Sequence, residues 1–147
     1  MTTILKANVF HIDDLAPLFD QYRVFYKQES NVEAAKKFLL QRIQKGESII
    51  FLAYWNDKPV GFTQLYTTFS SVSLESVFIL NDLYVSEVHR KKGIGDALLN
   101  KAKELCAERK HKELALETGI KNPAQKLYEK LGWKKDTDCF HYFWTCE

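Results

Sequence analysis

The sequence has few cysteines and histidines, and neither type is clustered. The three cysteines, Cys106, Cys139 and Cys146, are odd in number and widely spaced, with no CxxC pair of the kind that metal and redox sites use. We therefore expect reduced thiols with structural roles. The four histidines form no HExxH or paired-ligand spacing, so we predict no metal site.

Long apolar runs and an excess of one charge are also missing. No run approaches the ~20 apolar residues that span a bilayer, and residues 1–10 lack the apolar core and cleavage site of a secretory signal. These absences predict a cytoplasmic protein with no membrane partner. The 21 basic and 19 acidic residues leave a net charge of +2, which predicts no nucleic-acid partner. Any basic patch must be local.

No repeat, low-complexity tract or linker rich in proline and glycine interrupts the 147 residues, so we find no domain boundary. Hydrophobic residues make up 46% of the chain, as in an ordinary globular domain with one core. We therefore expect a single domain over residues 1–147.

Hydrophobic periodicity predicts the element order β-α-α-β-β-β-α-β-α-β, typical of an α/β or α+β sheet covered by helices. The expected strands are residues 2–7, 48–55, 60–67, 76–85, 113–118 and 140–146. Capping signals mark the helix starts, with Ser30 and Glu33 forming a capping box. The other expected helices begin after Asp13 and Asp14, after Gly95, and at Asn122, whose helix ends before Gly132.

The stretch HRKKGIGDALL, residues 89–99, places three cations and two glycines ahead of a helical apolar stripe. A helix N-terminus exposes unpaired N–H groups and a positive dipole end, and glycine lets phosphate oxygens approach closely. The junction is therefore suited to an anion. A tight turn that needs glycine beside a solvated basic run is the alternative. A Walker A loop is excluded, because Asp96 and Ala97 follow Gly95.

Arg90 to Gly95 match [QR]-x-x-G-x-[GA], and the stretch resembles the pyrophosphate-binding motif of the GNAT N-acetyltransferase superfamily. The resemblance extends over nearly the whole chain and implies a GNAT-like mixed, mostly antiparallel central sheet with about four flanking helices. It also implies acetyl transfer from acetyl-CoA to an amine by direct attack, with no covalent enzyme intermediate. The implied cofactor-binding residues are Leu83, Tyr84, Val85, Arg90, Lys91, Lys92, Gly93, Ile94, Gly95, Asp96 and Asn122.

The resemblance also implies catalytic residues. Tyr128 has the setting of the tyrosine that protonates the departing thiolate, although its helical spacing also suits a core aromatic. Asp82 and Glu117 have the strand positions of the general base, and each also suits a surface or edge-strand carboxylate. Asn122 lies one residue closer to Tyr128 than the family pattern, which puts Lys121 at the usual asparagine position. Asn122 is therefore equally well explained as a plain N-cap.

The family's acceptor pocket would here be rich in aromatic residues. Its expected walls are Tyr22, Arg23, Phe25, Tyr26, Glu29, Phe140, His141, Tyr142 and Trp144. We expect a small-molecule amine, while Asn81 replaces a glutamate typical of polyamine acetyltransferases. A protein or peptide amine, a catalytically silent acyl-CoA-binding module and a basic interaction domain remain alternatives. The sequence leaves open whether two copies form a homodimer.

Overall fold

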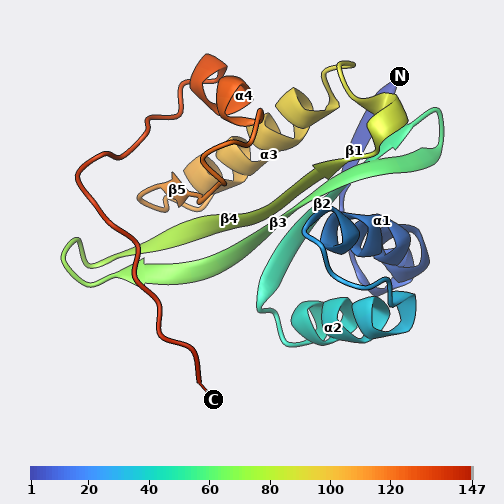
Figure 1. The fold of residues 1–147 in the computed structure, drawn as a ribbon, viewed down its shortest axis with the longest axis horizontal. Helices are drawn as coiled ribbons and strands as arrows, with labels where there is room; N and C mark the ends of the chain where they lie inside the picture. The colour runs from blue at the N-terminus through green and yellow to red at the C-terminus, as the bar shows by residue number, and fades with distance from the viewer. Residues whose placement is uncertain (147) are drawn as a thin grey trace. The chain divides into compact units, whose positions relative to one another are not determined.

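The computed structural model describes residues 1–146. The chain forms two compact units, Met1–Glu117 and the remainder from Thr118 onward. The first unit carries the sheet, and the second carries a short helix followed by an extended C-terminal stretch (Figure 1).

The sheet of the first unit is mostly antiparallel. Its strands are β1 (Thr2–Lys6), β2 (Ser48–Trp55), β3 (Lys58–Ser70), β4 (Glu75–Val85) and β5 (Leu114–Ala115). They lie in chain order, with β4 and β5 parallel and the other neighbours antiparallel. Asn56 and Asp57 join β2 to β3 with φ values of 49° and 66°, the two positive values that a tight hairpin turn of type I′ requires.

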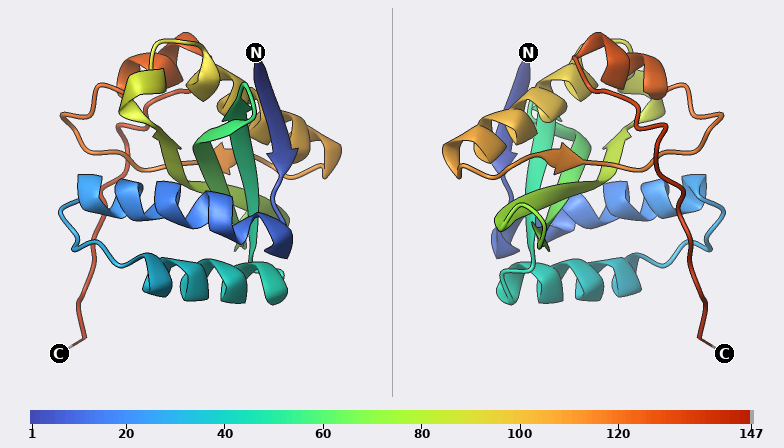
Figure 2. Two further views of the ribbon diagram at one scale, coloured as in Figure 1. Left: turned by 90° about the vertical axis from the view of Figure 1, so that its right-hand side faces the viewer. Right: turned by 90° about the vertical axis from the view of Figure 1, so that its left-hand side faces the viewer.

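Four α-helices occur within residues 1–146, which agrees with the predicted mixed fold. They are α1 (Ile12–Phe25), α2 (Val32–Gln44), α3 (Ile94–Glu108) and α4 (Gln125–Lys130), with short 3-10 turns η1 (Val9–His11) and η2 (Glu87–His89). Figure 2 shows α1 and α2 on one face of the sheet and α3 on the other. No helix in this part of the chain is long and apolar enough to cross a bilayer.

The core lies on both faces of β2. Residues 50–53 are all buried, which is expected where helices cover both sides of a strand. Ile50 and Leu52 pack with Leu15 of α1 and Leu39 of α2. Side chains alternate along a strand, so Phe51 faces the side that α3 covers.

Both predicted N-caps of the first two helices are wrong by one or two residues. Helix α1 begins at Ile12, so Asp13 and Asp14 lie in its first turn, where their charges favour the helix dipole. Helix α2 is capped by Asn31, whose Oδ1 accepts a hydrogen bond from Ala34 N at 3.0 Å. Ser30 lies one residue before this cap, and its hydroxyl donates to Asp20 Oδ2 at 2.6 Å.

The fourth predicted helix also begins later than expected. Helix α4 starts at Gln125, with Ala124 at the N-cap position. Asn122 Oδ1 accepts a hydrogen bond from Ala124 N at 2.9 Å, so Asn122 still organises the turn that precedes the helix. Gly132 follows the helix with φ 88°, the left-handed conformation that glycine tolerates best at a helix end.

The last two predicted strands differ most from the structure. The fifth strand is limited to Leu114–Ala115 instead of residues 113–118, and residues 140–146 form no strand. A strand needs a neighbour for its backbone groups, and residue type alone does not provide one. The prediction of a closing strand is therefore wrong for this chain as described.

Candidate active site

Strand β4 has an open edge near its C-terminal end. The ladder between β4 and β5 consists of Phe78 paired with Leu114 and Ile79 paired with Ala115. On the other side, β3 pairs with β4 as far as Val85. Residues 83–85 therefore have no strand neighbour on the β5 side within the described residues. These three residues are among those that the family resemblance predicts to bind the cofactor.

The loop after β4 carries a row of free amides. Among residues 1–146, no hydrogen-bond acceptor is found for the backbone N–H groups of residues 91–95. Lys91 and Gly93 have positive φ values of 64° and 78°, which turn the chain sharply before α3 starts at Ile94. Free N–H groups at a helix N-terminus are suited to phosphate oxygens. The free amides and the sharp turn expected at this junction are therefore present, and anion binding there stays a prediction.

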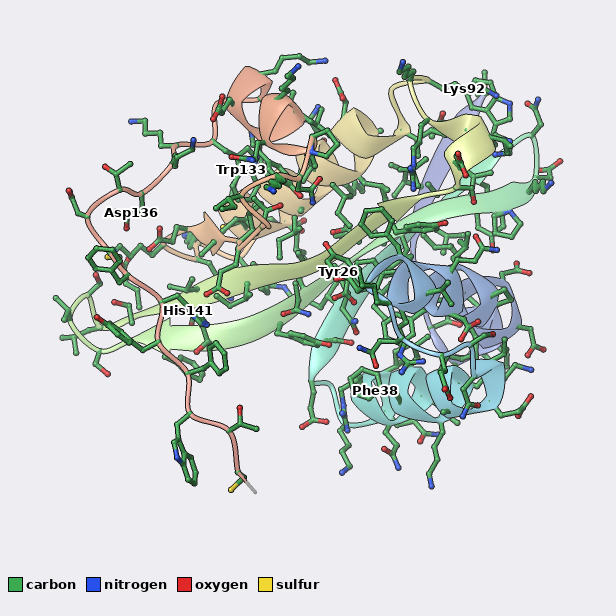
Figure 3. All side chains as sticks on the ribbon, in the orientation of Figure 1. Tyr26, Phe38, Lys92, Trp133, Asp136 and His141 are labelled. Atoms are coloured by element: carbon green, nitrogen blue, oxygen red, sulfur yellow. The ribbon has the colours of Figure 1, made fainter. Side chains whose placement is uncertain are left out.

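Two of the three cationic side chains in this loop make cation–π contacts with aromatic rings of the sheet. Arg90 Nε donates to Val85 O at 2.9 Å, and its guanidinium lies 5.6 Å from the centre of the Tyr84 ring. Lys92 Nζ lies 4.9 Å from the centre of the Trp55 ring, where Figure 3 labels it. Such contacts fix side chains as well as supply charge. Arg90 therefore holds the loop against the end of β4.

Arg90→Lys and Arg90→Ala distinguish the charge of Arg90 from its contacts with Val85 and Tyr84. We expect both variants to weaken CoA binding by about three- to tenfold, because lysine keeps the charge but cannot combine the bond to Val85 with the planar stack on Tyr84. Isothermal titration calorimetry with CoA measures the affinities. Full affinity in Arg90→Lys together with a loss in Arg90→Ala would show that charge alone matters.

A bulge bends β4 beside α1. The register with β3 shifts so that Gln64 faces Asp82 and Leu65 faces Leu80, which leaves Asn81 without a partner. A bulge of this kind kinks a strand and redirects its side chains. The Tyr22 hydroxyl of α1 donates to the exposed carbonyl oxygen of Asn81 at 3.3 Å.

Next to the bulge, Asp82 is only 3% exposed. Its carboxylate accepts hydrogen bonds from the side-chain amides of Gln64 and Asn81. Burial raises the pKa of Asp82 above its ordinary value, although these bonds oppose the shift. Burial and the nearby Asp82 charge also raise the pKa of Tyr22, so Tyr22 remains a neutral hydroxyl. Asp82 is thus a buried carboxyl group, not the surface carboxylate of the alternative interpretation, and its role as the general base stays a prediction.

The raised pKa of Asp82 predicts a pH effect on stability. Its protonated form favours folding below the unfolded pKa, and this contribution is lost as the pH rises through the higher folded pKa. Asp82→Asn has no carboxyl group to ionise, so it should not lose this stability. We therefore expect its free energy of unfolding, compared with that of the parent, to increase from about pH 4 upward. Gln64 can turn its amide to pair with the new side chain, because its Oε1 has no partner among the described residues.

Urea denaturation between pH 4 and pH 8 checks this expectation. If the difference between the urea midpoints of the parent and Asp82→Asn does not change with pH, the pKa of Asp82 is not raised. Gln64→Leu is a useful companion variant, since it removes one hydrogen bond to the carboxylate. The stability of this variant should fall more steeply with rising pH than that of the parent.

The second predicted base is placed differently. Glu117 is exposed and lies two residues beyond the end of β5 at Ala115. The strand therefore does not carry Glu117 alongside Asp82, and the expectation that it is a fifth-strand carboxylate is wrong. The strand stops early because only two of its residues pair with β4.

In the second unit, Tyr128 lies within α4 and packs against an aromatic neighbour. Its ring centre is 5.9 Å from that of Trp133, and Trp133 N donates to Tyr128 O at 3.0 Å. These contacts fix the position of the Tyr128 ring relative to the helix end. Its catalytic role stays a prediction.

The first unit also contains a hollow of about 910 Å³ that sequence reasoning missed. Its walls come from α1, the start of β3, the end of β4 and η2, and they include Asp14, Glu87, Lys58 and Arg90. Of the α1 residues expected around an acceptor, Phe25 lines this hollow. The signal lay in the acidic first turn of α1, which was interpreted only as a cap.

Together, these features define a mixed α/β protein with free backbone amides at a helix N-terminus beside an open strand edge. The family model described as "Acetyltransferase (GNAT) family" matches residues 12–133. This chain belongs to that family and is an N-acetyltransferase. The resemblance found in the sequence is thereby confirmed.

Individual relatives agree with this assignment. The chain is 46% identical over 140 residues to the uncharacterized N-acetyltransferase YhfO of Bacillus subtilis (strain 168), covering 95% of this chain and 94% of the relative. It is 40% identical to a probable acetyltransferase of known crystal structure, with a TM-score of 0.92 over 99% of this chain and 98% of that one.

A more distant structure shares the fold. The aminoglycoside N-acetyltransferase AAC(6')-Iy in complex with CoA is 19% identical, with a TM-score of 0.82 over 99% of this chain and 96% of that one. At this identity the likeness concerns the fold alone.

Proposed function

We propose that this acetyltransferase moves an acetyl group from acetyl-CoA to the primary amine of a small molecule by direct attack, without a covalent enzyme intermediate. The observation that carries the proposal is the row of free amides at residues 91–95, next to the open edge of β4. We further propose that both compact units act as one acetyltransferase domain over residues 1–147. A cytoplasmic location remains our expectation.

The residues around the loop fit the donor. Free N–H groups and the positive end of α3 suit a pyrophosphate, and exposed Gly93 offers no side chain that would block its approach. The open backbone edge at residues 83–85 suits the amide groups of a pantetheine arm. Acetyl-CoA supplies the activated thioester acyl group, and we assign its binding to these two elements.

The chain's own groups then handle the protons. An amine attacks only as the free base, so a nearby carboxylate with a raised pKa is useful. We assign this role to Asp82, whose carboxyl group has the Tyr22 hydroxyl as a hydrogen-bonding neighbour. Tyr128 is our candidate to protonate the departing thiolate, since a phenol remains protonated at neutral pH. Glu117 is the alternative base if Asp82→Asn retains activity.

A release assay for CoA thiol tests the proposal. Acetyl-CoA is offered with panels of small amines, amino acids, aminoglycosides and peptides, and the products are confirmed by mass spectrometry. Turnover with a small amine supports the proposal, whereas turnover only with peptides would reassign the acceptor to proteins. CoA binding without turnover on any panel would favour a silent acyl-CoA-binding module.

A further inference from the structure

Two buried polar atoms of the sheet lack hydrogen-bond partners. They are Gln64 Oε1 of β3 and Ser48 Oγ of β2, and neither has a partner within residues 1–146. Gln64 is fully buried, and its Nε2 already donates to Asp82 Oδ2, so its Oε1 must find a donor elsewhere. A buried polar atom without a partner costs stability. Both atoms therefore indicate a ligand that supplies the missing partners.

Both residues face the side of the sheet that α1 and α2 cover (Figure 2). Side chains alternate along a strand, and Ile50 and Phe62 belong to the core that packs with these helices. Ser48 and Gln64 each lie two residues from one of these core residues, so both share that face. The register places Ser48 opposite Tyr66, which lies two residues beyond Gln64. Along the strand direction, Gln64 and Ser48 are therefore roughly 7 Å apart.

Arg42 of α2 supplies a positive charge at the Ser48 end of this row. Its Nε donates to Glu47 Oε1 at 3.0 Å, and Glu47 directly precedes Ser48. Its guanidinium lies 4.7 Å from the centre of the Phe38 ring, a contact that holds the group in place. Within the described residues, its two Nη atoms form no hydrogen bond. That edge of the guanidinium can bind a carboxylate or a phosphate through two parallel hydrogen bonds.

Asp82 supplies the opposite charge at the Gln64 end. Burial and the Asp82 charge raise the pKa of Tyr66 to about 12, whereas the charge of Arg42 opposes the shift. The Tyr66 side chain therefore lies within reach of both charges. The row runs from a buried carboxyl group, past a neutral phenol, to a guanidinium.

Aromatic rings of both helices extend along this row. The ring centres of Tyr22 and Tyr26 on α1 are 5.0 Å apart, and Phe19 lies 6.3 Å from Tyr22 and 5.8 Å from Phe38 of α2. Tyr26 and Phe38, both labelled in Figure 3, are 49% and 37% exposed. A ligand that enters here from solvent would contact apolar ring surface between its polar ends.

We propose that the acceptor is a primary amine that also carries an anionic group, joined to the nitrogen by an apolar chain of about four or five carbons. The ammonium donates to Asp82 and to Gln64 Oε1. The anionic group pairs with Arg42 and accepts a hydrogen bond from Ser48 Oγ. The spacing of roughly 7 Å is too long for an α-amino acid that reacts through its α-amine. This inference rests on the proposed function and names the acceptor class of the same site.

A matched set of acceptors tests this class. δ-Aminovalerate ends in a carboxylate, pentylamine of the same chain length ends in a methyl group, and cadaverine ends in a second amine. We expect kcat/KM for δ-aminovalerate to exceed the values for pentylamine and cadaverine by at least about tenfold. A still higher value for aminopropyl phosphate would support the class with phosphate as its anion.

Arg42→Met tests the assigned cation. Methionine keeps an apolar contact with Phe38 but has no guanidinium, so the preference for δ-aminovalerate over pentylamine should fall by at least about tenfold, mainly through KM. Arg42→Lys should restore only part of the preference, because its point charge cannot form two parallel bonds. Arg109→Met, which removes an exposed arginine at the end of α3, should keep the full preference. Urea denaturation verifies that each variant is folded.

Melting temperature gives a readout that needs no turnover. With CoA present, δ-aminovalerate should raise the melting temperature more than pentylamine does, and Arg42→Met should abolish the difference. Equal kcat/KM values for δ-aminovalerate and pentylamine in the parent would overturn this inference and leave the proposed function intact. A parent that acetylates no small amine and shows no melting shift with either compound would overturn both.

Discussion

Tyr128→Phe is expected to lower the turnover of acetyl transfer by ~10²- to 10⁴-fold, the usual contribution of one positioned acid. The substitution removes the hydroxyl that would protonate the departing thiolate and keeps the aromatic ring. Affinity for acetyl-CoA should barely change, because the hydroxyl matters only as the thiolate leaves. Steady-state kinetics with the identified amine gives turnover, and calorimetry with CoA gives affinity.

The loss must be separated from a loss of folding. The phenylalanine ring retains the contact with Trp133, 5.9 Å away in the parent, so stability should fall by no more than ~1 to 3 kcal/mol. Tyr54→Phe is the control, since Tyr54 lies in β2, its hydroxyl donates to Asp14 Oδ2, and it has no assigned role in the reaction. A Tyr128→Phe enzyme with nearly parental turnover across pH would assign proton donation to water or another group.

The sequence predicted most elements because their signals are local. Residues 94–108 form α3 with the expected apolar face, and Asn56 and Asp57 form a turn between the strands expected at residues 48–55 and 60–67. The helix caps failed where a distant group intervened. Ser30 has the right chemistry for a cap, but its hydroxyl donates a hydrogen bond to Asp20 of the preceding helix. Asn31 caps α2 instead.

The candidate site was predictable in outline only. The glycines and cations of residues 90–95 indicated an anion-binding loop, and the fold leaves the amides of residues 91–95 free. The sequence could not show that Arg90 and Lys92 rest on aromatic rings, because Trp55 is far from Lys92 along the chain. Nor could it show that Asp82 is buried, since its burial depends on α1 packing against the β4 bulge.

The failure at residues 140–146 has a different cause. The residue types are those of a strand, and the structure contradicts only the assumption that a neighbouring strand is available to them. Strand pairing is a property of two segments, so no pattern within one segment can establish it. The same incomplete pairing limits β5 to Leu114 and Ala115.

Gly93→Val is expected to weaken CoA binding by about 10- to 100-fold. Gly93 precedes α3 with φ 78°, a conformation that a β-branched residue rarely adopts. Valine would therefore turn the neighbouring amides away from the pyrophosphate and add a side chain in its path. The loss of one hydrogen bond to a charged group, about 1.5–3 kcal/mol, accounts for this range.

Gly46→Val provides a closely matched control for backbone strain. Gly46 has φ 65°, and a Cβ atom at either glycine would meet no atom within 4 Å. Both variants should lose at least about 1–2 kcal/mol of stability from the left-handed conformation, but only Gly93→Val should lose affinity. Urea denaturation measures the first quantity and calorimetry with CoA the second. If Gly93→Val fails to fold, Gly93→Ala replaces it, again paired with Gly46→Ala. Equal affinity in the two folded variants would show that the amides at residues 91–95 do not hold the cofactor.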